Sequence, residues 1–411
     1  MKYTQSSNIQ FITILFIIFV SAAEIDICVP SFPQIQAEFH LSAFKTEILL
    51  GANLLFHCLA ALLVGNLGDK YGKKKVINIG FITFILGSAV CFFAGSYYML
   101  VAGRIIQGIG VAASLVLAPI IIMELYQEKA KQQKMMAMLN GFVTLAMCMA
   151  PTIGSYTTLL FNWRSNFVLL TVFGCLALAM FNTFIRADKA AKPETKLSIK
   201  EYGVVFQSNK TLLYIIGIAF ITGAYYTFVG MASIIYVESF GVSLKDFGLY
   251  QGSLTLTFGV VSIFSGSMMQ KFGNKLSFIV SMILTVLFLV ICLWLVVFNI
   301  QNPLYITAAI LLLSIGVVMP CNMLYLFGLN SLAGASGKIS SIFTVGKWLF
   351  TVVGIQTASY FYAHDFRSTG ILMFIMELAG VVITLVLLSK DKKFYQEMYK
   401  PKQKKPITIE L

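Results

Sequence analysis

The sequence predicts an all-α integral membrane protein, with twelve transmembrane helices arranged as two pseudo-symmetric six-helix halves. Three observations support this fold class. Apolar runs of about twenty residues recur from end to end, charged residues are scarce, and one long polar stretch divides the runs into two sets. Apolar residues form 58% of the 411 residues and charged residues only 11%. Because a soluble domain carries roughly 25% charged residues, a large soluble core does not explain this composition.

The apolar runs match the length of membrane-spanning helices. A helix rises 1.5 Å per residue and needs about 20 residues to cross ~30 Å of hydrocarbon. Backbone groups in lipid must be bonded within the chain, and the runs are too long for barrel strands, so we expect helices. The predicted spans are residues 9–29, 45–67, 76–95, 99–124, 136–159, 165–185, 211–236, 247–269, 276–298, 304–327, 339–362 and 369–389.

The first apolar run could be mistaken for a signal peptide, because Ser21-Ala22-Ala23 looks like a cleavage site. The apolar stretch continues past that site and is long enough to span the membrane. We therefore expect it to be retained as the first helix.

Lysine and arginine gather in every second loop and in the C-terminal tail. The first such loop alone holds Lys70, Lys73, Lys74 and Lys75. The alternate loops hold far fewer, chiefly Lys45, Arg164, Lys245 and Arg367. Because cytoplasmic loops are the ones rich in lysine and arginine, we predict that both termini are cytoplasmic. Membrane topology also accounts for the net charge of +13, so we expect no nucleic-acid partner.

The polar stretch between the sixth and seventh spans predicts the domain organisation. We assign residues 1–186 to the N-terminal half, 187–210 to a cytoplasmic linker, 211–390 to the C-terminal half and 391–411 to a basic cytoplasmic tail. An internal repeat supports the two halves. Gly65-Asn-Leu-Gly-Asp-Lys-Tyr-Gly-Lys-Lys follows the second span, and Gly266-Ser-Met-Met-Gln-Lys-Phe-Gly-Asn-Lys follows the eighth.

No metal or cofactor site is expected from the sequence. The seven cysteines are scattered, with no pair at a metal-ligand spacing, and the three histidines (His40, His57 and His364) do not cluster. A membrane-embedded enzyme would need such clusters at one depth, so we do not predict an enzyme. No phosphate-binding loop is present either, which points to an ion gradient as the energy source.

Four motifs lie at defined places along the chain. The loop after the second span carries Gly65, Asp69, Lys70, Gly72, Lys73 and Lys74. The fourth span carries Arg104, Gln107, Gly108 and Gly110, and the fifth carries Pro151 and Gly154. The first span ends in Asp26-Ile-Cys-Val-Pro30-Ser-Phe-Pro33. Glycine permits tight turns and close helix approach. An arginine inside a membrane normally faces protein or water.

Together these motifs resemble the major facilitator superfamily, and within it the bicyclomycin/chloramphenicol-type drug/proton antiporters. The resemblance covers nearly the whole chain, although Ala150 and Ser155 replace two glycines of the family's fifth-helix element. It implies the major facilitator fold in a bacterial inner membrane. It also implies that Asp26 carries a proton and that Arg104 tunes this carboxylate. Asp69 would steady contacts between the halves.

Several residues remain open to more than one interpretation. Glu24 is either a second proton site or an interfacial carboxylate, and Arg104 could instead reach the interface. Lys347 and Glu377 form either a structural ion pair or part of the transport path. Pro151 could be an ordinary helix kink.

With this resemblance, the function predicted is a proton-coupled secondary transporter that exports small lipophilic or cationic compounds by alternating access; the resemblance alone implies the proton as the coupling ion. An importer of a nutrient or siderophore on the same fold is the alternative, because a fold does not determine substrate or direction. The expected partners are a small-molecule substrate, protons and membrane lipid, and we expect a monomer.

Overall fold

The computed structural model describes residues 2–126, 128–185, 203–332 and 336–399. Residues 187–202 of the predicted linker and residues 400–411 of the predicted tail therefore lie outside the described residues. Within the described ranges the chain forms helices and no strands. In the described part of the chain, twelve helical segments are long and apolar enough to cross a membrane, as predicted.

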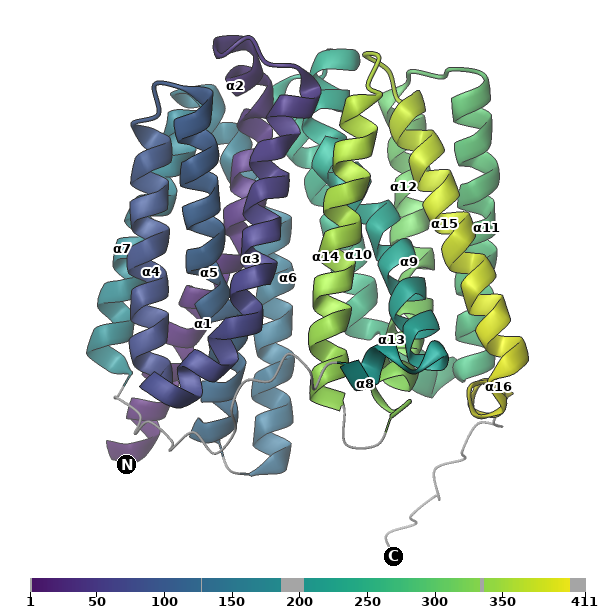
Figure 1. Cartoon of the computed structure of the whole chain (residues 1–411), viewed down its shortest axis with the longest axis horizontal. Helices are drawn as coiled ribbons and strands as arrows, with labels where there is room; N and C mark the ends of the chain where they lie inside the picture. The colour runs from purple at the N-terminus through teal and green to yellow at the C-terminus, as the bar shows by residue number, and fades with distance from the viewer. Residues whose placement is uncertain (1, 127, 186–202, 333–335, 400–411) are drawn as a thin grey trace, which may run out of the picture.

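The N-terminal half contains the first six of these segments. Its elements are α1 (Lys2–Cys28), η1 (Val29–Ser31), α2 (Phe32–Glu38), α3 (Ala43–Tyr71), α4 (Lys73–Phe92), α5 (Tyr97–Leu125), α6 (Lys129–Leu160) and α7 (Arg164–Phe184). The C-terminal half contains α9 (Asn209–Ser233), η3 (Ile234–Ser239), α10 (Leu244–Phe272), α11 (Asn274–Val297), α12 (Pro303–Gly316), α13 (Val318–Leu329), α14 (Ser336–Tyr360) and α15 (Arg367–Lys390). Two short helices flank it: α8 (Gly203–Phe206) lies in the predicted linker and α16 (Lys392–Tyr399) in the predicted tail. The two halves stand side by side, and α8 and α16 lie at the same end as the start of α1 (Figure 1).

Serine side chains begin several of the spans. Ser42, Ser96, Ser208 and Ser243 precede α3, α5, α9 and α10, and each accepts a hydrogen bond from a backbone N–H three residues later. Such capping satisfies donors that the first turn leaves free. Each of these four spans therefore begins at a defined residue.

Three of the predicted spans are not single regular helices. The first ends at Cys28 and continues through η1 and α2, because Pro30 and Pro33 lack the backbone N–H that a continuous helix needs. The seventh ends in a π-helical turn, η3. The tenth is divided at Val317 into α12 and α13. Predictions based on hydropathy alone did not identify these breaks, since each segment is apolar throughout.

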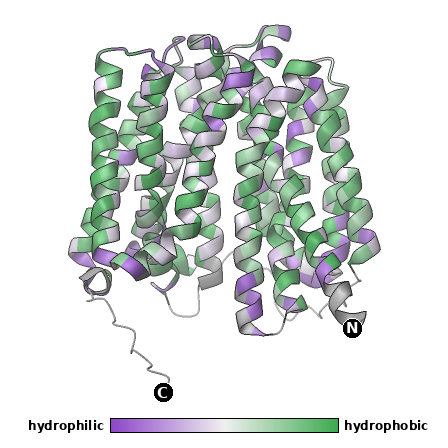
Figure 2. Cartoon of the chain, turned by 180° about the vertical axis from the view of Figure 1, so that it is seen from behind, coloured by the Kyte–Doolittle hydropathy of each residue, from purple (hydrophilic) through white to green (hydrophobic). Residues whose placement is uncertain are grey.

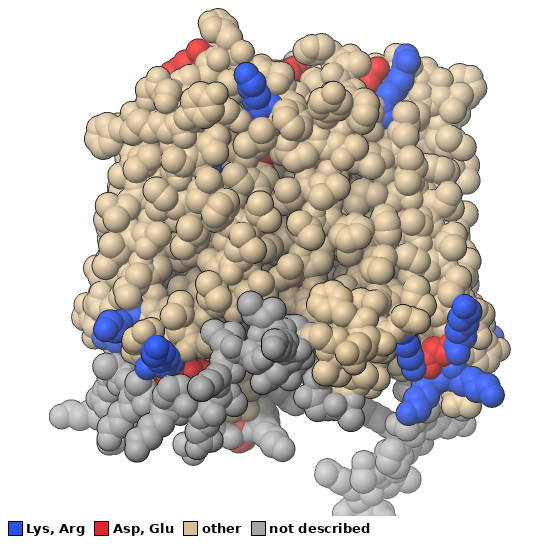
Figure 3. All heavy atoms as spheres, viewed as in Figure 1, with Lys and Arg blue, Asp and Glu red and all other residues tan. Residues whose placement is uncertain are grey.

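The outer surface of the bundle is suited to lipid. Hydrophobic residues dominate the middle of the helices, and hydrophilic residues are more frequent near their ends (Figure 2). On the face shown in Figure 3, lysine and arginine lie near the two ends, and a broad belt between them carries almost none. Large apolar residues such as Leu63, Ile263 and Val290 are more than half exposed. Exposed apolar surface of this extent is favourable only where hydrocarbon replaces water.

The two copies of the loop motif have the same backbone conformation. Gly72 joins α3 to α4 with φ of 88°, and Gly273 joins α10 to α11 with φ of 85°. Each donates its N–H to the carbonyl four residues earlier, at 2.9 Å. Positive φ is strained for a residue with a Cβ, which explains why glycine recurs at this offset.

Candidate functional site: a cavity between the halves

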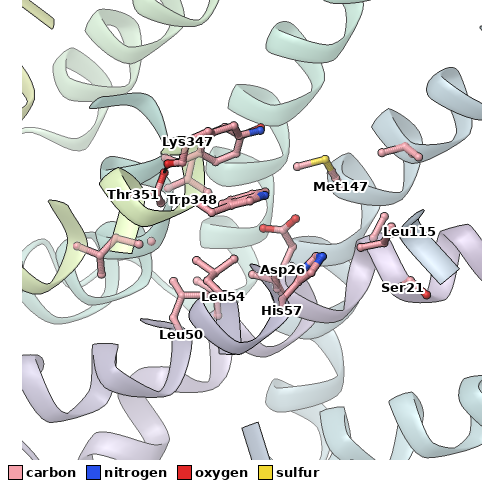
Figure 4. Close-up of a pocket in the computed structure, with 18 residues that line it drawn as sticks. Ser21, Asp26, Leu50, Leu54, His57, Leu115, Met147, Lys347, Trp348 and Thr351 are labelled. Carbon is pink, nitrogen blue, oxygen red and sulfur yellow. Dashed lines mark hydrogen bonds between the residues drawn. The ribbon is translucent and has the colours of Figure 1, made fainter. Parts of the chain in front are cut away.

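A cavity of about 220 Å³ lies between the two halves of the bundle. The N-terminal half lines it from α1, α3, α5 and α6, and the C-terminal half from α9 and α14. Most of the lining is apolar, and we call this space the central cavity. Figure 4 shows how the labelled side chains from opposite halves face one another across it.

Asp26 is the acidic residue of the central cavity. It lies two residues before the end of α1, and its side chain is 5% exposed. The carboxylate points from α1 toward the α14 side of the cavity, beside His57 of α3 (Figure 4). Among the described residues it has no hydrogen-bond or ion-pair partner. A buried carboxylate in this state is a group that readily takes up either a proton or a cation.

Lys347 is the basic residue of the same cavity and comes from α14 of the other half. Its ammonium lies 4.4 Å from the ring centroid of Tyr226 and 4.4 Å from that of Trp348. Such cation–π contacts partly offset the loss of hydration. The aromatic rings thus hold the lysine inside an otherwise apolar wall.

The expected ion pair between Lys347 and Glu377 is not formed. Lys347 faces the cavity and its aromatic partners, whereas Glu377 of α15 is 1% exposed and is absent from the cavity lining. One carboxylate oxygen of Glu377 has no hydrogen-bond partner in the described part of the chain. The two residues lie in spans that are neighbours in the sequence, but the helix face that carries Lys347 borders the cavity and the face that carries Glu377 does not.

Arg104 pairs with Glu24 rather than with Asp26. The guanidinium donates to Glu24 Oε1, and the two side chains are 1% and 0% exposed. Residues two apart on a helix point about 200° apart, so α1 turns Glu24 toward α5 and Asp26 toward the cavity. The resemblance had assigned the tuning of Asp26 to Arg104, and the geometry corrects that assignment. It also excludes the interpretation of Glu24 as an interfacial carboxylate.

A hydrogen-bond network holds the Glu24–Arg104 pair inside the N-terminal half. Asn53 of α3 donates to Glu24 Oε1 and to the carbonyl of Arg104, each at 3.0 Å. Arg104 donates at 2.9 Å to Gln107, whose amide donates at 2.8 Å to Ser88 of α4. The network joins α1, α3, α4 and α5, and buried charges need such partners. Arg104 therefore does not reach the membrane interface.

The glycines of the α5 motif allow the helices of this network to approach. A Cβ added at Gly108 would lie 2.3 Å from the carbonyl oxygen of Asn53, and one added at Gly110 would lie 2.5 Å from the backbone nitrogen of Phe84. Real Cβ atoms do not approach so closely. The pattern of small residues thus has the packing role predicted for it.

The α6 motif packs against both halves. A Cβ added at Gly154 would lie 2.1 Å from the carbonyl oxygen of Ile27, directly beside Asp26 in the chain. Thr152 donates at 3.1 Å to the carbonyl of Gly248 in α10. Pro151 lies inside α6, which continues through it without a break. The motif therefore joins the cavity-lining end of α1 to the C-terminal half.

The loop between α3 and α4 anchors helices of its own half. Lys73 pairs with Glu124 at 2.9 Å, and Lys74 donates to the carbonyls of Asn182 and Ile185. Lys70 lies over the ring of Tyr71. Asp69 is exposed and has no partner in the described ranges, so the contact between halves implied for it is not formed here. Gly65 has open space around it and does not serve close packing.

Sequence reasoning missed several polar groups that the fold brings together. Tyr226 and Trp348 were not singled out, because they lie among many aromatic residues. Glu47 was not singled out as a site residue either; it is fully buried, and both its carboxylate oxygens lack hydrogen-bond partners in the described residues. The carboxylate of Glu238, in the C-terminal half, is close enough to interact electrostatically with that of Glu47 as a like charge. A lone polar residue within an apolar run was the available signal.

No group of three or more histidine, cysteine, aspartate or glutamate residues in the described ranges is arranged to hold a metal ion.

A family model described as the Major Facilitator Superfamily matches residues 14–355 and, in a second match, residues 214–408. The chain belongs to the major facilitator superfamily.

Relatives within the superfamily include transporters named for drug resistance. The chain is 26% identical over 308 residues to YdgK from Bacillus subtilis, an uncharacterized transporter of the major facilitator type, covering 72% of the chain and 75% of the relative. It is 25% identical to a bicyclomycin resistance protein homolog from Haemophilus influenzae, over 67% and 70% of the two chains. It is 27% identical to the multidrug resistance protein MdtL from Escherichia coli, over 58% and 60%.

Solved structures support the same fold. A bacterial homolog of the human lysosomal transporter Spinster, in an inward-facing and unoccupied conformation, superposes with a TM-score of 0.75 at 14% identity. That comparison covers 96% of this chain and 99% of the other. A peptide transporter in complex with sulfate gives 0.76 at 12% identity, covering 95% and 96%. At these identities the likeness concerns the fold alone.

Proposed function

We propose that this superfamily member is a proton-coupled exporter of small lipophilic or cationic compounds that works by alternating access in a bacterial inner membrane. The observation that carries the proposal is the unpaired Asp26 carboxylate in an apolar cavity lined by both halves. The drug-resistance names of two relatives support the substrate class and the direction.

The chemistry of Asp26 would allow exchange of a proton for a substrate. Ionised, the carboxylate attracts a cation into the apolar cavity; protonated, it is neutral and releases that cation. The two ligands compete for one site, and this competition couples their movements in opposite directions. The apolar walls would bind lipophilic bodies.

Contacts between the halves would have to exchange during alternating access. At the end of the bundle opposite α8 and α16, Phe44 of α3 packs against Tyr360 of α14 with ring centroids 5.7 Å apart (Figure 1). A Cβ added at Gly230 of α9 would lie 3.2 Å from Leu50 of α3. Separation of residues 1–186 from 211–390 at this end would open the cavity to that side.

Transport by the purified full-length chain in proteoliposomes tests the function. With an acidic interior, vesicles containing the protein should accumulate the lipophilic cation tetraphenylphosphonium, and addition of the cation should discharge the pH gradient. Empty vesicles and protein vesicles treated with a protonophore should do neither. In cells, expression should lower accumulation of the cation. Higher accumulation would favour the importer, and no proton-linked flux in vesicles would refute the proposal.

We also propose that the end carrying α8 and α16 is cytoplasmic, because the basic loops lie there. Asn209→Cys and Ser243→Cys place exposed thiols at the starts of α9 and α10, at opposite ends of the bundle. In a background lacking the exposed Cys175, an impermeant maleimide added to intact cells should label Ser243→Cys and not Asn209→Cys. Both should react after permeabilisation, and labelling of Asn209→Cys alone in intact cells would reverse the topology.

A further inference from the structure

The central cavity holds one negative and one positive side chain, supplied by opposite halves. Asp26 comes from α1, and Lys347 comes from α14. Neither forms an ion pair within the described residues, and Figure 4 shows the Asp26 carboxylate turned toward the side of the cavity that carries Lys347 and Trp348. The cavity thus presents two separated charges of opposite sign.

Uncompensated charges in an apolar membrane cavity are costly, and a ligand that neutralises them gains affinity. A simple cation can neutralise Asp26, but it leaves Lys347 without a counter-charge and is repelled by it. A simple anion has the converse problem. A molecule that carries both charges compensates both side chains at once.

The aromatic residues of the cavity favour the same conclusion. Tyr226 and Trp348 provide the ring faces that usually bind an organic cation. Here the Lys347 ammonium already lies 4.4 Å from each ring centroid. A substrate cation at these rings would have to displace the lysine, whereas a carboxylate can bind the ammonium while the rings stay in contact with it.

We propose that the preferred substrate of the central cavity is a small zwitterion with an apolar body, whose ammonium pairs with Asp26 and whose carboxylate pairs with Lys347. This inference rests on the proposed function, because it assigns a substrate to the same cavity. A ligand held in this way also bridges α1 and α14. Binding would therefore draw the two halves together around the substrate.

Three compounds share the same apolar body but differ in charge. L-phenylalanine is a zwitterion, its methyl ester is a cation, and N-acetyl-L-phenylalanine is an anion. Binding of radiolabelled L-phenylalanine to the full-length chain in detergent, competed by the unlabelled compounds, gives their relative affinities. The zwitterion should bind about tenfold or more tightly than either analogue, as expected for one charge-assisted hydrogen bond.

Variants of Lys347 test the role assigned to it. Lys347→Gln should remove the advantage of the zwitterion over its methyl ester, and Lys347→Arg should retain most of it. The same lysine-to-glutamine change at the exposed Lys245, outside the cavity, should leave all three affinities unchanged. If Lys347→Arg keeps the preference for the zwitterion over its methyl ester, the effect of Lys347→Gln comes from the lost positive charge and not from loss of folding.

Two results would overturn the inference while leaving the proposed function intact. In one, the methyl ester binds the wild-type protein as tightly as the zwitterion. In the other, none of the three compounds binds although proton-linked flux of tetraphenylphosphonium is normal. If proton-linked flux is absent for tetraphenylphosphonium and for L-phenylalanine alike, the proposed function itself fails.

Discussion

Asp26→Asn should abolish proton-linked transport while substrate binding remains measurable. Asparagine preserves the size of the side chain but takes up no proton, so the cavity loses its exchangeable group. Flux of tetraphenylphosphonium driven by an imposed pH gradient should fall to the level of empty vesicles. Binding should weaken, because the negative charge is lost, but the apolar walls of the cavity remain.

The pH dependence of binding gives this prediction a second readout. In the wild type, cation affinity should fall as pH falls, because a proton on Asp26 removes the charge that attracts the cation. In Asp26→Asn that pH dependence should vanish. The other titratable groups of the lining are His57, Tyr226 and Lys347, and none of them is changed. Asp246→Asn, an exposed carboxylate at the start of α10, serves as the matched control with wild-type flux.

Exchange at the wild-type rate by Asp26→Asn would show that another group carries the proton. Glu24, Glu377 and Lys347 would then be the residues to examine. Glu24 and Glu377 are buried away from the cavity, so either would require a larger rearrangement to exchange a proton with solvent.

The sequence predicted the number and position of the spans, because membrane crossing imposes one simple length requirement on an apolar run. It also predicted that Gly108 and Gly110 serve close packing. Their physical requirement is local, since a Cβ at these positions meets neighbouring backbone. Such requirements are visible in a single sequence as small residues at helical spacing.

Pairing between side chains could not be predicted in the same way. Glu24 and Asp26 are two residues apart, and which of them faces Arg104 depends on the rotation of α1 about its axis. An error of half a turn exchanges the two, and neither hydropathy nor composition defines that rotation in an apolar helix. The same uncertainty explains the wrong pairing of Lys347 with Glu377, and the missed contact of Lys347 with Tyr226 and Trp348.

Arg104→Ala should cause a large loss of folded protein. The substitution leaves Glu24, which is 0% exposed, without its counter-charge, and it removes the donor to Gln107. Breaking a buried ion pair on one side costs about 3–5 kcal/mol, whereas replacing both partners by neutral groups is often tolerated. The double variant Glu24→Gln/Arg104→Gln should therefore recover most of the folded protein, since its amides can donate to one another and to Asn53.

Thermal unfolding of the detergent-solubilised variants, followed by size-exclusion chromatography, measures these differences. Arg164→Ala is the matched control: it breaks the Arg164–Glu38 pair, whose side chains are 29% and 42% exposed, and pairs of this kind are worth less than about 1 kcal/mol. Because the guanidinium of Arg104 does not contact Asp26, the double variant should keep proton-linked flux. Loss of that flux in a folded double variant would indicate that the Glu24–Arg104 pair takes part in coupling. If Arg104→Ala proved as stable as Arg164→Ala, the buried network would not hold α1, α3, α4 and α5 together as the geometry implies.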